Sequence, residues 1–366
     1  MLAPIVHVLG ARPNFVKAAP VIDALRAARY PQSVVHTGQH YDERLSDVFF
    51  AQLGLPEPDV NLGIGSGSHA EQTAAAMVGL EREFLARSPG LVVVYGDVNS
   101  TLAAALVAAK LHLPVAHVEA GLRSFDETMP EEINRRLTDQ LCELLFTTSP
   151  EAVGHLVNEG VDLARVHFVG NPMIDTLLAN LDRFDTERVR RDQALPDRYA
   201  VATLHRPANV DDPEVASTLV RALHEVAASA DVVIPVHPRG RATLEAAGLS
   251  RDPRVHVREP LSYVEFVALV RGAAAVITDS GGVQEETTVL GVPCLTLRPN
   301  TERPITISHG TNRLVTYQEL VPAARKAIEE PLTEADAPER PPLWDGRAGA
   351  RIASVIAAWM ERDVLR

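Results

Sequence analysis

Three carboxylates and a histidine in this chain of 366 residues stand where a protein can move protons. Asp97 lies in YGDVNST, Glu119 in HVEAGLR, Glu131 in MPEEINRR and His205 in TLHRPAN. Such side chains serve as general acids and bases, which a reaction at a C–H bond requires. Taken singly, Asp97 is better interpreted as a helix cap and Glu131 as a charge at a helix N-terminus. Their joint position after predicted strands favours catalysis.

A second set of residues suits a phosphorylated ligand. The segment DSGGVQEE follows a predicted strand and opens a helix, where N–H groups and the helix dipole favour a phosphate. Its small residues are Ser280, Gly281 and Gly282. Arg12 and Lys17 follow the first predicted strand and suit a pyrophosphate or an anionic leaving group. An ordinary strand-to-helix turn and two solvated cations are the alternatives.

Composition restricts the partners and the compartment. Lys and Arg number 35 against 48 Asp and Glu, and the net charge of −13 argues against broad binding to nucleic acid or anionic membranes. The two cysteines, Cys142 and Cys294, lie far apart in the sequence, and the histidines show no zinc-binding spacing on a predicted helix, so we expect no metal site. The first residues lack the features of a secretory leader, and no apolar run approaches the ~18 residues of a membrane span. We therefore expect a cytoplasmic enzyme.

The elements that must position these residues follow an alternating pattern. Short β-branched runs alternate with Ala/Leu-rich stretches, which is typical of βαβ units with parallel sheets. The predicted strands are 5–10, 33–38, 91–97, 115–120 and 144–149, then 199–205, 231–237, 255–260, 274–280 and 293–298. In the helix predicted over 131–143, Ile133, Leu137 and Leu141 form an apolar stripe that continues to Leu145. Ligands of such sheets bind beyond the carboxyl ends of the strands, where the candidate residues stand.

Two α/β sheets of similar size predict two Rossmann-like domains facing a central cleft. The segment FVGNPMIDTL, which contains Gly170, Asn171 and Pro172, is a plausible hinge between them. Residues 331–346 are rich in proline and acidic residues and should form a loop, and a last helix is predicted over about 347–362.

Eleven segments, in order along almost the whole chain, resemble the non-hydrolysing UDP-N-acetylglucosamine 2-epimerases. They are GARPNFVK, TGQHYD, YGDVNSTLAA, HVEAGLRS, PEEINRRLTD, HFVGNPMIDTL, TLHRPANVDD, IPVHPR, ITDSGGVQEE, GVPCLTLRPNTERP and GTN. The resemblance implies a glycosyltransferase-B architecture. Residues 1–168 would form an N-terminal Rossmann-like domain with the catalytic carboxylates, 169–346 a C-terminal Rossmann-like domain that binds UDP, and 347–366 a helix packed back on the first domain.

The resemblance also implies a reaction. Members interconvert UDP-GlcNAc and UDP-ManNAc at C2 without a cofactor, by eliminating UDP to 2-acetamidoglucal and adding it back, and so feed surface polysaccharide synthesis. A homodimer is implied as well. The C2 proton is not acidic, so its removal needs a base while cations and N–H groups stabilise the departing UDP.

Matching positions in the motifs imply the role of each residue. Acid/base roles fall to Asp97, Glu119, Glu131 and His205, and which of them takes the C2 proton stays open. The diphosphate would be bound by Arg12, Lys17, Ser280, Gly281 and Gly282. Glu286 would bind the ribose, Arg303 would bind the sugar or phosphate, and Tyr263 would lie near the uracil. Bacterial members bind a second UDP-GlcNAc, and the matching positions are Gln39, Gln72, Arg206 and His237.

Some alternatives stay open. The chain has HRPAN where many members carry a polar pair, and Pro207 and Ala208 make activation by a second substrate less secure. Relatives of similar sequence epimerise UDP-diacetamido-uronic acids. A hydrolysing relative that releases free sugar, a glycosyltransferase on the same fold and a non-catalytic sugar-nucleotide sensor are the other functions considered.

Overall fold

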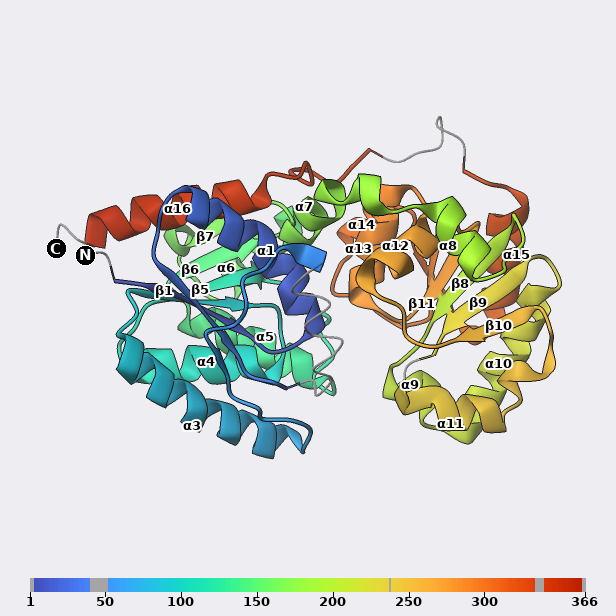
Figure 1. The fold of residues 1–366 in the computed structure, drawn as a ribbon, viewed down its shortest axis with the longest axis horizontal. Helices are drawn as coiled ribbons and strands as arrows, with labels where there is room; N and C mark the ends of the chain where they lie inside the picture. Colours follow the sequence, from blue (N-terminus) through green and yellow to red (C-terminus); the bar gives the residue numbers. More distant parts are fainter. Residues whose placement is uncertain (1–2, 40–51, 237, 333–338, 364–366) are drawn as a thin grey trace. The chain divides into compact units, whose positions relative to one another are not determined.

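The computed structural model describes residues 3–39, 52–236, 238–332 and 339–363. The chain forms two compact units, one of Met1–Ala179 with Pro342–Arg366 and one of Asn180–Pro341 (Figure 1). These borders differ from the expected ones after residues 168 and 346. Helix α7 (Pro172–Ala179) packs against α1 (Arg12–Ala27), and Trp344 is buried with its Nε1 donating to the Thr148 carbonyl at 2.9 Å, so both segments belong to the first unit.

The first unit contains a parallel sheet with the order β3-β2-β1-β4-β5-β6-β7. Its strands are β1 (Ile5–Leu9), β2 (Gln32–His36), β3 (Val60–Asn61), β4 (Leu91–Tyr95), β5 (Val115–Ala120), β6 (Leu144–Thr147) and β7 (Val166–Phe168). The central strands β1 and β4 are fully buried and, apart from His7, hydrophobic, as expected for strands covered on both faces. The strand order reverses between them, so their carboxyl ends form the topological switch point where ligands of such sheets bind.

Helices cover both faces of this sheet. Figure 1 shows α1, α7 and the last helix α16 (Ala348–Asp363) on one face, and α3 (His69–Arg87), α4 (Asn99–Lys110) and α5 (Pro130–Leu141) on the other. Helix α6 (Pro150–Asn158) follows β6. The α16 helix packs against α1, and the Gly349 N–H near its start donates to Asp175 of α7 at 2.7 Å. The chain therefore returns to its first unit after completing the second.

Helix α5 differs from the expected apolar stripe. It ends at Leu141, so Leu145 lies in β6, and Ile133 and Leu137 are each 49% exposed. The buried face of α5 is polar instead: Glu132, Asn134, Arg135, Thr138 and Asp139. Periodicity located the helix correctly but not its inner face.

The second unit contains a parallel sheet with the order β10-β9-β8-β11-β12-β13. Its strands are β8 (Tyr199–Thr203), β9 (Asp231–Pro235), β10 (Val255–Arg258), β11 (Ala275–Thr278), β12 (Cys294–Thr296) and β13 (Asn312–Leu314). Its helices are α8 (Thr186–Asp192), α9 (Pro207–Val210), α10 (Pro213–Ala227), α11 (Pro238–Ala246), α12 (Tyr263–Arg271), α13 (Gly281–Leu290), α14 (Ile305–Ser308) and α15 (Tyr317–Glu329). Both units are Rossmann-like, as the sequence predicts.

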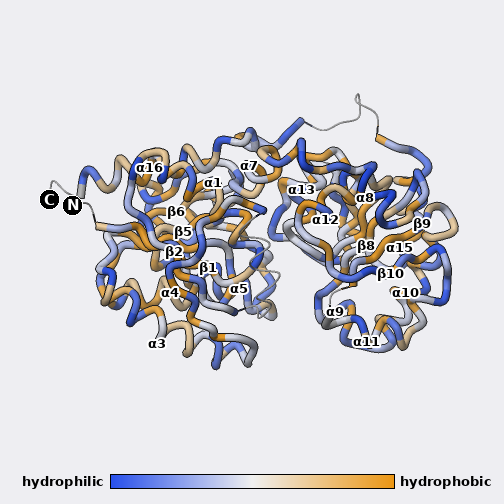
Figure 2. Tube along the Cα trace, in the orientation of Figure 1, coloured by the Kyte–Doolittle hydropathy of each residue, from blue (hydrophilic) through white to orange (hydrophobic). Residues whose placement is uncertain are grey.

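Each unit has a hydrophobic core of its own. In Figure 2 the hydrophobic residues concentrate along the strands of both sheets, and the polar residues along the outer helices and loops. The short edge strands β3, β7 and β13 were not predicted, because two or three residues carry too little periodicity. Within the described part of the chain, none of the helices is long and apolar enough to cross a membrane.

Candidate active site

The carboxyl ends of β1, β4 and β5 bring Lys17 and Glu119 together in the first unit. The two side chains form an ion pair with only 5% and 3% of their surfaces exposed. They lie against Gly96, which has a φ of +62°, and a Cβ there would lie 3.2 Å from both Glu119 Oε2 and Lys17 Nζ. Glycine is therefore needed here for its backbone conformation and for space. The sequence placed these two residues at strand ends without predicting that they pair.

The turn that carries Asp97 is held by side chains from three helices. The Tyr95 carbonyl accepts from Asn14 Nδ2 at 2.8 Å and from Thr101 Oγ1 at 2.9 Å. The Asp97 carbonyl accepts from Asn134 Nδ2 at 2.9 Å. Because side chains of α1, α4 and α5 all hydrogen-bond to this turn, the backbone that carries the Asp97 carboxylate is held in place.

Arg135 of α5 determines where the Asp97 carboxylate lies. Its Nε and Nη2 both approach Asp97 Oδ2 at 2.9 Å, and its Nη1 pairs with Glu132. Glu132 in turn accepts from the backbone N–H groups of Ser124 at 2.9 Å and Phe125 at 3.2 Å. Asp97 is about one-quarter exposed, so it is both oriented and accessible. Glu131, the residue that we predicted, stands in the first turn of α5 and is only partly buried.

Sequence reasoning missed Glu132, Asn134 and Arg135. They follow Glu131 in PEEINRR, but their burial on one helix face is visible only in the structure, where such a polar face must have partners. The apolar spacing of the same helix pointed to the opposite face.

Gln39 and Gln72, two of the positions implied for a second ligand, contact the N-terminus of α4 beside Asp97. Gln39 Oε1 accepts from Ser100 Oγ at 2.8 Å, and Gln72 Oε1 accepts from Asn99 Nδ2 at 3.0 Å. Arg12 is the first residue of α1 and is partly buried. His237 lies outside the described residues.

In the second unit, His205 is oriented by Asp279. Its Nδ1 lies 2.9 Å from Asp279 Oδ1, and 45% of its side-chain surface is exposed. The fully buried Asp279 also accepts from the N–H of Arg206 and from Asn209 Nδ2, each at 2.9 Å. Burial acts to raise the pKa of Asp279, but the hydrogen bond and charge of His205 and the other donors lower it by more. A carboxylate that fixes Nδ1–H leaves Nε2 as the ring nitrogen directed away from Asp279, which is the arrangement of an oriented acid/base histidine.

The turn at Asp279 continues into α13, with Ser280 as its N-cap and Gly281 and Gly282 in its first turn. The Arg303 guanidinium packs beneath this turn, since a Cβ on Gly281 would lie 2.3 Å from Arg303 Nη1. Arg303 pairs with Glu302 and, at 3.0 Å, with Glu285, and both pairs are almost fully buried. A cation and the N–H groups of a helix N-terminus thus occur together, as an anion requires.

Arg206 and the residues after it complete this region. The Arg206 Nε donates to the Asp279 carbonyl at 3.0 Å, so this cation is fastened to the same turn. Pro207, which departs from the family pattern, is the first residue of α9, and both it and Ala208 are exposed.

Glu286 of α13 and Tyr263 of α12 form a hydrogen-bonded pair, and both residues are more than nine-tenths buried. Burial raises the pKa of Glu286 to about 8, with the charge of Glu285 adding to the rise and the hydrogen bond from Tyr263 opposing it. The pKa of Tyr263 is also raised by burial and by Glu286. At neutral pH the Glu286 carboxyl therefore exists largely protonated, and it can both donate and accept hydrogen bonds.

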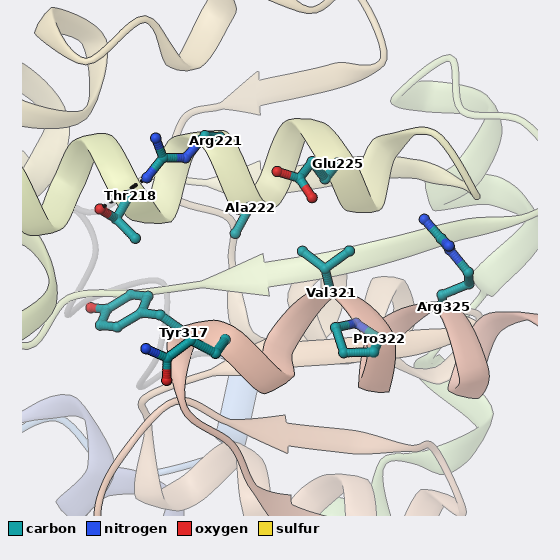
Figure 3. Close-up of a pocket in the computed structure, with 9 residues that line it drawn as sticks. Thr218, Arg221, Ala222, Glu225, Tyr317, Val321, Pro322 and Arg325 are labelled. Atoms are coloured by element: carbon teal, nitrogen blue, oxygen red, sulfur yellow. Dashed lines mark hydrogen bonds between the residues drawn. The ribbon is translucent and has the colours of Figure 1, made fainter.

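A groove of about 610 Å³ lies elsewhere in the second unit, between α10 and α15 (Figure 3). It is lined by residues such as Arg221, Glu225, Tyr317 and Arg325, and by none of the predicted site residues. The candidate chemistry is concentrated at the carboxyl ends of the strands instead.

Comparison with known proteins identifies the family. The family model described as UDP-N-acetylglucosamine 2-epimerase matches residues 23–357. The UDP-N-acetylglucosamine 2-epimerase of Methanocaldococcus jannaschii is 41% identical over 361 residues, which cover 95% of this chain and 97% of that protein. The chain belongs to the UDP-N-acetylglucosamine 2-epimerase family.

Two further matches bear on the structure and the substrate of this family member. The crystal structure of the Methanocaldococcus jannaschii enzyme in complex with UDP-GlcNAc and UDP has a TM-score of 0.89 at 40% identity, over 97% of this chain and 99% of that one. The UDP-2,3-diacetamido-2,3-dideoxy-D-glucuronate 2-epimerase of Pseudomonas aeruginosa is 41% identical, over 96% of this chain and 99% of that protein. The predicted fold class, two Rossmann-like domains of the glycosyltransferase-B type, and the predicted family are confirmed.

Proposed function

We propose that this protein interconverts UDP-GlcNAc and UDP-ManNAc by reversible elimination of UDP. The observation that carries the proposal is the pair of strand-end carboxylates in the first unit. Glu119 forms an ion pair with Lys17, and Asp97 forms one with Arg135. These groups can exchange a proton at carbon while a cation neutralises the developing charge. Family membership and the UDP-GlcNAc complex of the Methanocaldococcus jannaschii enzyme support the substrate.

The chemistry runs in two steps that balance. A base removes the proton from C2, the electrons of that C–H bond form the C1–C2 double bond, and the C1–O bond breaks to release UDP. A proton is then delivered to the opposite face of C2, and a phosphate oxygen of UDP attacks C1. Substrate and product are isomers, so the overall reaction consumes no oxidant or reductant.

We assign the steps to the residues whose surroundings suit them. Asp97, Glu119 and Glu131 handle the C2 proton, and His205, oriented by Asp279, serves as a further acid/base group. Lys17, Arg12 and Arg303 with the first turn of α13 hold the diphosphate, where N–H groups and guanidinium stabilise the leaving group. Glu286 takes the ribose hydroxyls, and Tyr263 lies near the uracil through its contact with Glu286.

A diacetamido uronic acid is the second candidate substrate, because the Pseudomonas aeruginosa relative is as similar as the Methanocaldococcus jannaschii enzyme. The two substrates differ by a carboxylate and a second acetamido group, so they are separated by direct comparison. We expect conversion of UDP-GlcNAc to a mixture with UDP-ManNAc when purified protein is supplied with neither nicotinamide nor added metal. Turnover of only the UDP-diacetamido-uronic acid would show that this sugar, and not UDP-GlcNAc, is the substrate. Release of free ManNAc and UDP would indicate a hydrolysing enzyme.

Gln39, Gln72, Arg206 and His237 are proposed to bind a second UDP-GlcNAc. Support comes from the first two, which hydrogen-bond to the N-terminus of α4 beside Asp97. The expected result is a sigmoidal rate curve for UDP-ManNAc that UDP-GlcNAc makes hyperbolic. Hyperbolic curves under both conditions would remove this role. We further propose a cytoplasmic location and a role in supplying surface polysaccharide precursors.

We also propose a homodimer formed through α3, α4 and α5. Apolar side chains are exposed along these adjacent helices: Val78, Leu85, Ile133 and Leu137. A patch of this kind on a monomer favours association with a second copy. Leu137→Glu should give a monomer in light scattering, whereas the control Ile307→Glu, at an exposed position of the second unit, should not. A monomeric wild-type protein would contradict the proposal.

A further inference from the structure

A fully buried histidine, His117 of β5, stands two residues before Glu119 and hydrogen-bonds through both ring nitrogens. Its Nδ1 lies 2.7 Å from Asp139 Oδ1, and its Nε2 lies 2.8 Å from the Gly96 carbonyl oxygen. A backbone carbonyl only accepts hydrogen bonds, and so does an ionised carboxylate. If Asp139 is ionised, both ring nitrogens must donate, and the ring carries a proton on each.

The surroundings of Asp139 favour its ionised form. It accepts from Arg123 Nη2 at 2.7 Å and from the Gly121 N–H at 3.1 Å, in addition to His117. Burial acts to raise the pKa of Asp139, but the hydrogen bonds and charges of His117 and Arg123 lower it by more. Arg123 also donates to both carboxylate oxygens of Glu159, at 2.8 and 2.7 Å.

The charges of this buried cluster balance. With His117 protonated, two cations, His117 and Arg123, face two carboxylates, Asp139 and Glu159, and every charge has an opposite partner within hydrogen-bond distance. Such a set can remain charged in a low-dielectric interior, whereas removal of one partner leaves a costly buried charge. Cys142 is a further titratable neighbour of Asp139, and burial raises the pKa of its thiol well above the ordinary value, so it stays a neutral thiol.

The cluster joins the two turns that carry the proposed proton-transfer residues. The carbonyl that His117 holds belongs to Gly96, directly before Asp97. The N–H that Asp139 holds belongs to Gly121, two residues after Glu119. Glu119 itself has a φ of +78°, a strained conformation for a residue with a side chain, which persists only where neighbouring contacts enforce it.

We propose that His117 is a permanently protonated imidazolium that, with Asp139, positions Asp97 and Glu119 for proton transfer at C2. The claim rests on the proposed function for its catalytic consequence. It makes His117 and Asp139 positioning residues that act through the backbone at Gly96 and Gly121. A neutral ring would leave a bare nitrogen against either the Gly96 carbonyl or the Asp139 carboxylate, which repel it.

The protonation state is tested on the wild-type protein by nitrogen NMR of its histidine rings. The His117 signals are assigned by their loss in His117→Asn. We expect both ring nitrogens of His117 to carry protons from neutral to alkaline pH. A His117 ring with one unprotonated nitrogen at neutral pH would overturn the proposal. The measurement needs no substrate, so it is decided independently of the epimerase activity.

The positioning role is tested by separating chemistry from binding. In Asp139→Asn and His117→Phe we expect kcat to fall at least tenfold while the Kd for UDP changes less than threefold. Of the groups that we propose to hold the diphosphate, Arg303 and the first turn of α13 lie in the second unit and are untouched, and Lys17 and Arg12 keep their charges. His117→Gln keeps one donor and should retain more activity than His117→Phe. Unchanged kcat in both Asp139→Asn and His117→Phe, or an equal loss of UDP binding, would contradict the role. An inactive wild-type protein would instead contradict the proposed function.

Discussion

Two buried carboxylates of the second unit, Asp279 and Glu286, differ in charge because their surroundings differ. The Asp279 carboxylate accepts hydrogen bonds from His205, Arg206 and Asn209. These donors keep it charged although its side chain is fully buried. Glu286 has Tyr263 as a hydrogen-bond donor and the charge of Glu285 beside it, and its pKa is raised to about 8, chiefly by burial. The number of hydrogen-bond donors thus separates an orienting carboxylate from a neutral one.

Asp279→Asn is expected to lower kcat about 100-fold, the usual range for loss of an acid/base group, while the Kd for UDP changes little. An amide at this place no longer holds the Nδ1–H of His205 in one orientation. Steady-state rates with calorimetric UDP binding test this. The matched control is Asp252→Asn, a partly buried carboxylate of the same unit that pairs with Arg254. Equal rates for the two variants would remove His205 from the mechanism.

Glu286 predicts a pH dependence of stability. Its pKa rises from an ordinary 4.5 to about 8 on folding, so between these values the folded protein binds more protons than the unfolded one. Stability contributed by this neutral carboxyl is therefore present at low pH and falls as pH rises through that window. Glu286→Gln, which cannot ionise, should gain Tm over the wild type as pH increases from about 5 to about 8. A Tm difference independent of pH, like that expected for the exposed control Glu225→Gln, would contradict the assignment.

The sequence singled out Asp97 and His205 as candidates because each follows a recognisable strand, and their catalytic roles stay a prediction. It did not single out the residues that orient them. Arg135 and Asp279, which orient them, lie 38 and 74 residues away in the chain. Pairing across such separations depends on strand order and helix orientation, and neither is written in a local pattern.

At the scale of secondary-structure elements, α5 and α13 carry much of the site, and each departs from a simple helix. Helix α5 buries a polar face and exposes Ile133 and Leu137, so periodicity alone assigned its apolar stripe to the wrong environment. Helix α13 begins with two glycines and buries Glu285 and Glu286 in its second turn. Both departures serve contacts to charged groups, which hydrophobic patterns do not encode.

Gly281→Ala should weaken UDP binding about tenfold, about 1.4 kcal/mol, because the new methyl group displaces the cation beneath the helix. A Cβ would lie 2.3 Å from Arg303 Nη1 and 2.7 Å from Glu302 Oε1. The control is Gly154→Ala within α6, where an added Cβ would meet no other residue within 4 Å. This substitution should leave UDP binding unchanged. Calorimetric titration with UDP measures both. A Gly281→Ala protein that binds UDP as tightly as wild type would show that Arg303 does not support the anion site.

At the scale of the whole molecule, each of the two Rossmann-like units contains part of the candidate site. We propose that the first contributes the carboxylates and the lysine at its topological switch point, and that the second contributes the helix N-terminus, the histidine and Arg303. Alternating strands and helices predicted both units, while the crossover of α16 to the first unit came from the family resemblance. The exact border at Ala179 could not be predicted, because α7 joins the first unit through its packing on α1 and α16, which are distant in sequence.

The most direct measurement is the fate of the C2 hydrogen when the protein equilibrates UDP-GlcNAc in heavy water, with no nicotinamide or metal added. Proton NMR and mass spectrometry report the isotope at each sugar position. We predict deuterium at C2 of both UDP-GlcNAc and UDP-ManNAc and at no other carbon, with the incorporation abolished in Asp97→Asn or Glu119→Gln. Formation of UDP-ManNAc that retains the original hydrogen, or no exchange by demonstrably folded protein, would contradict the elimination mechanism.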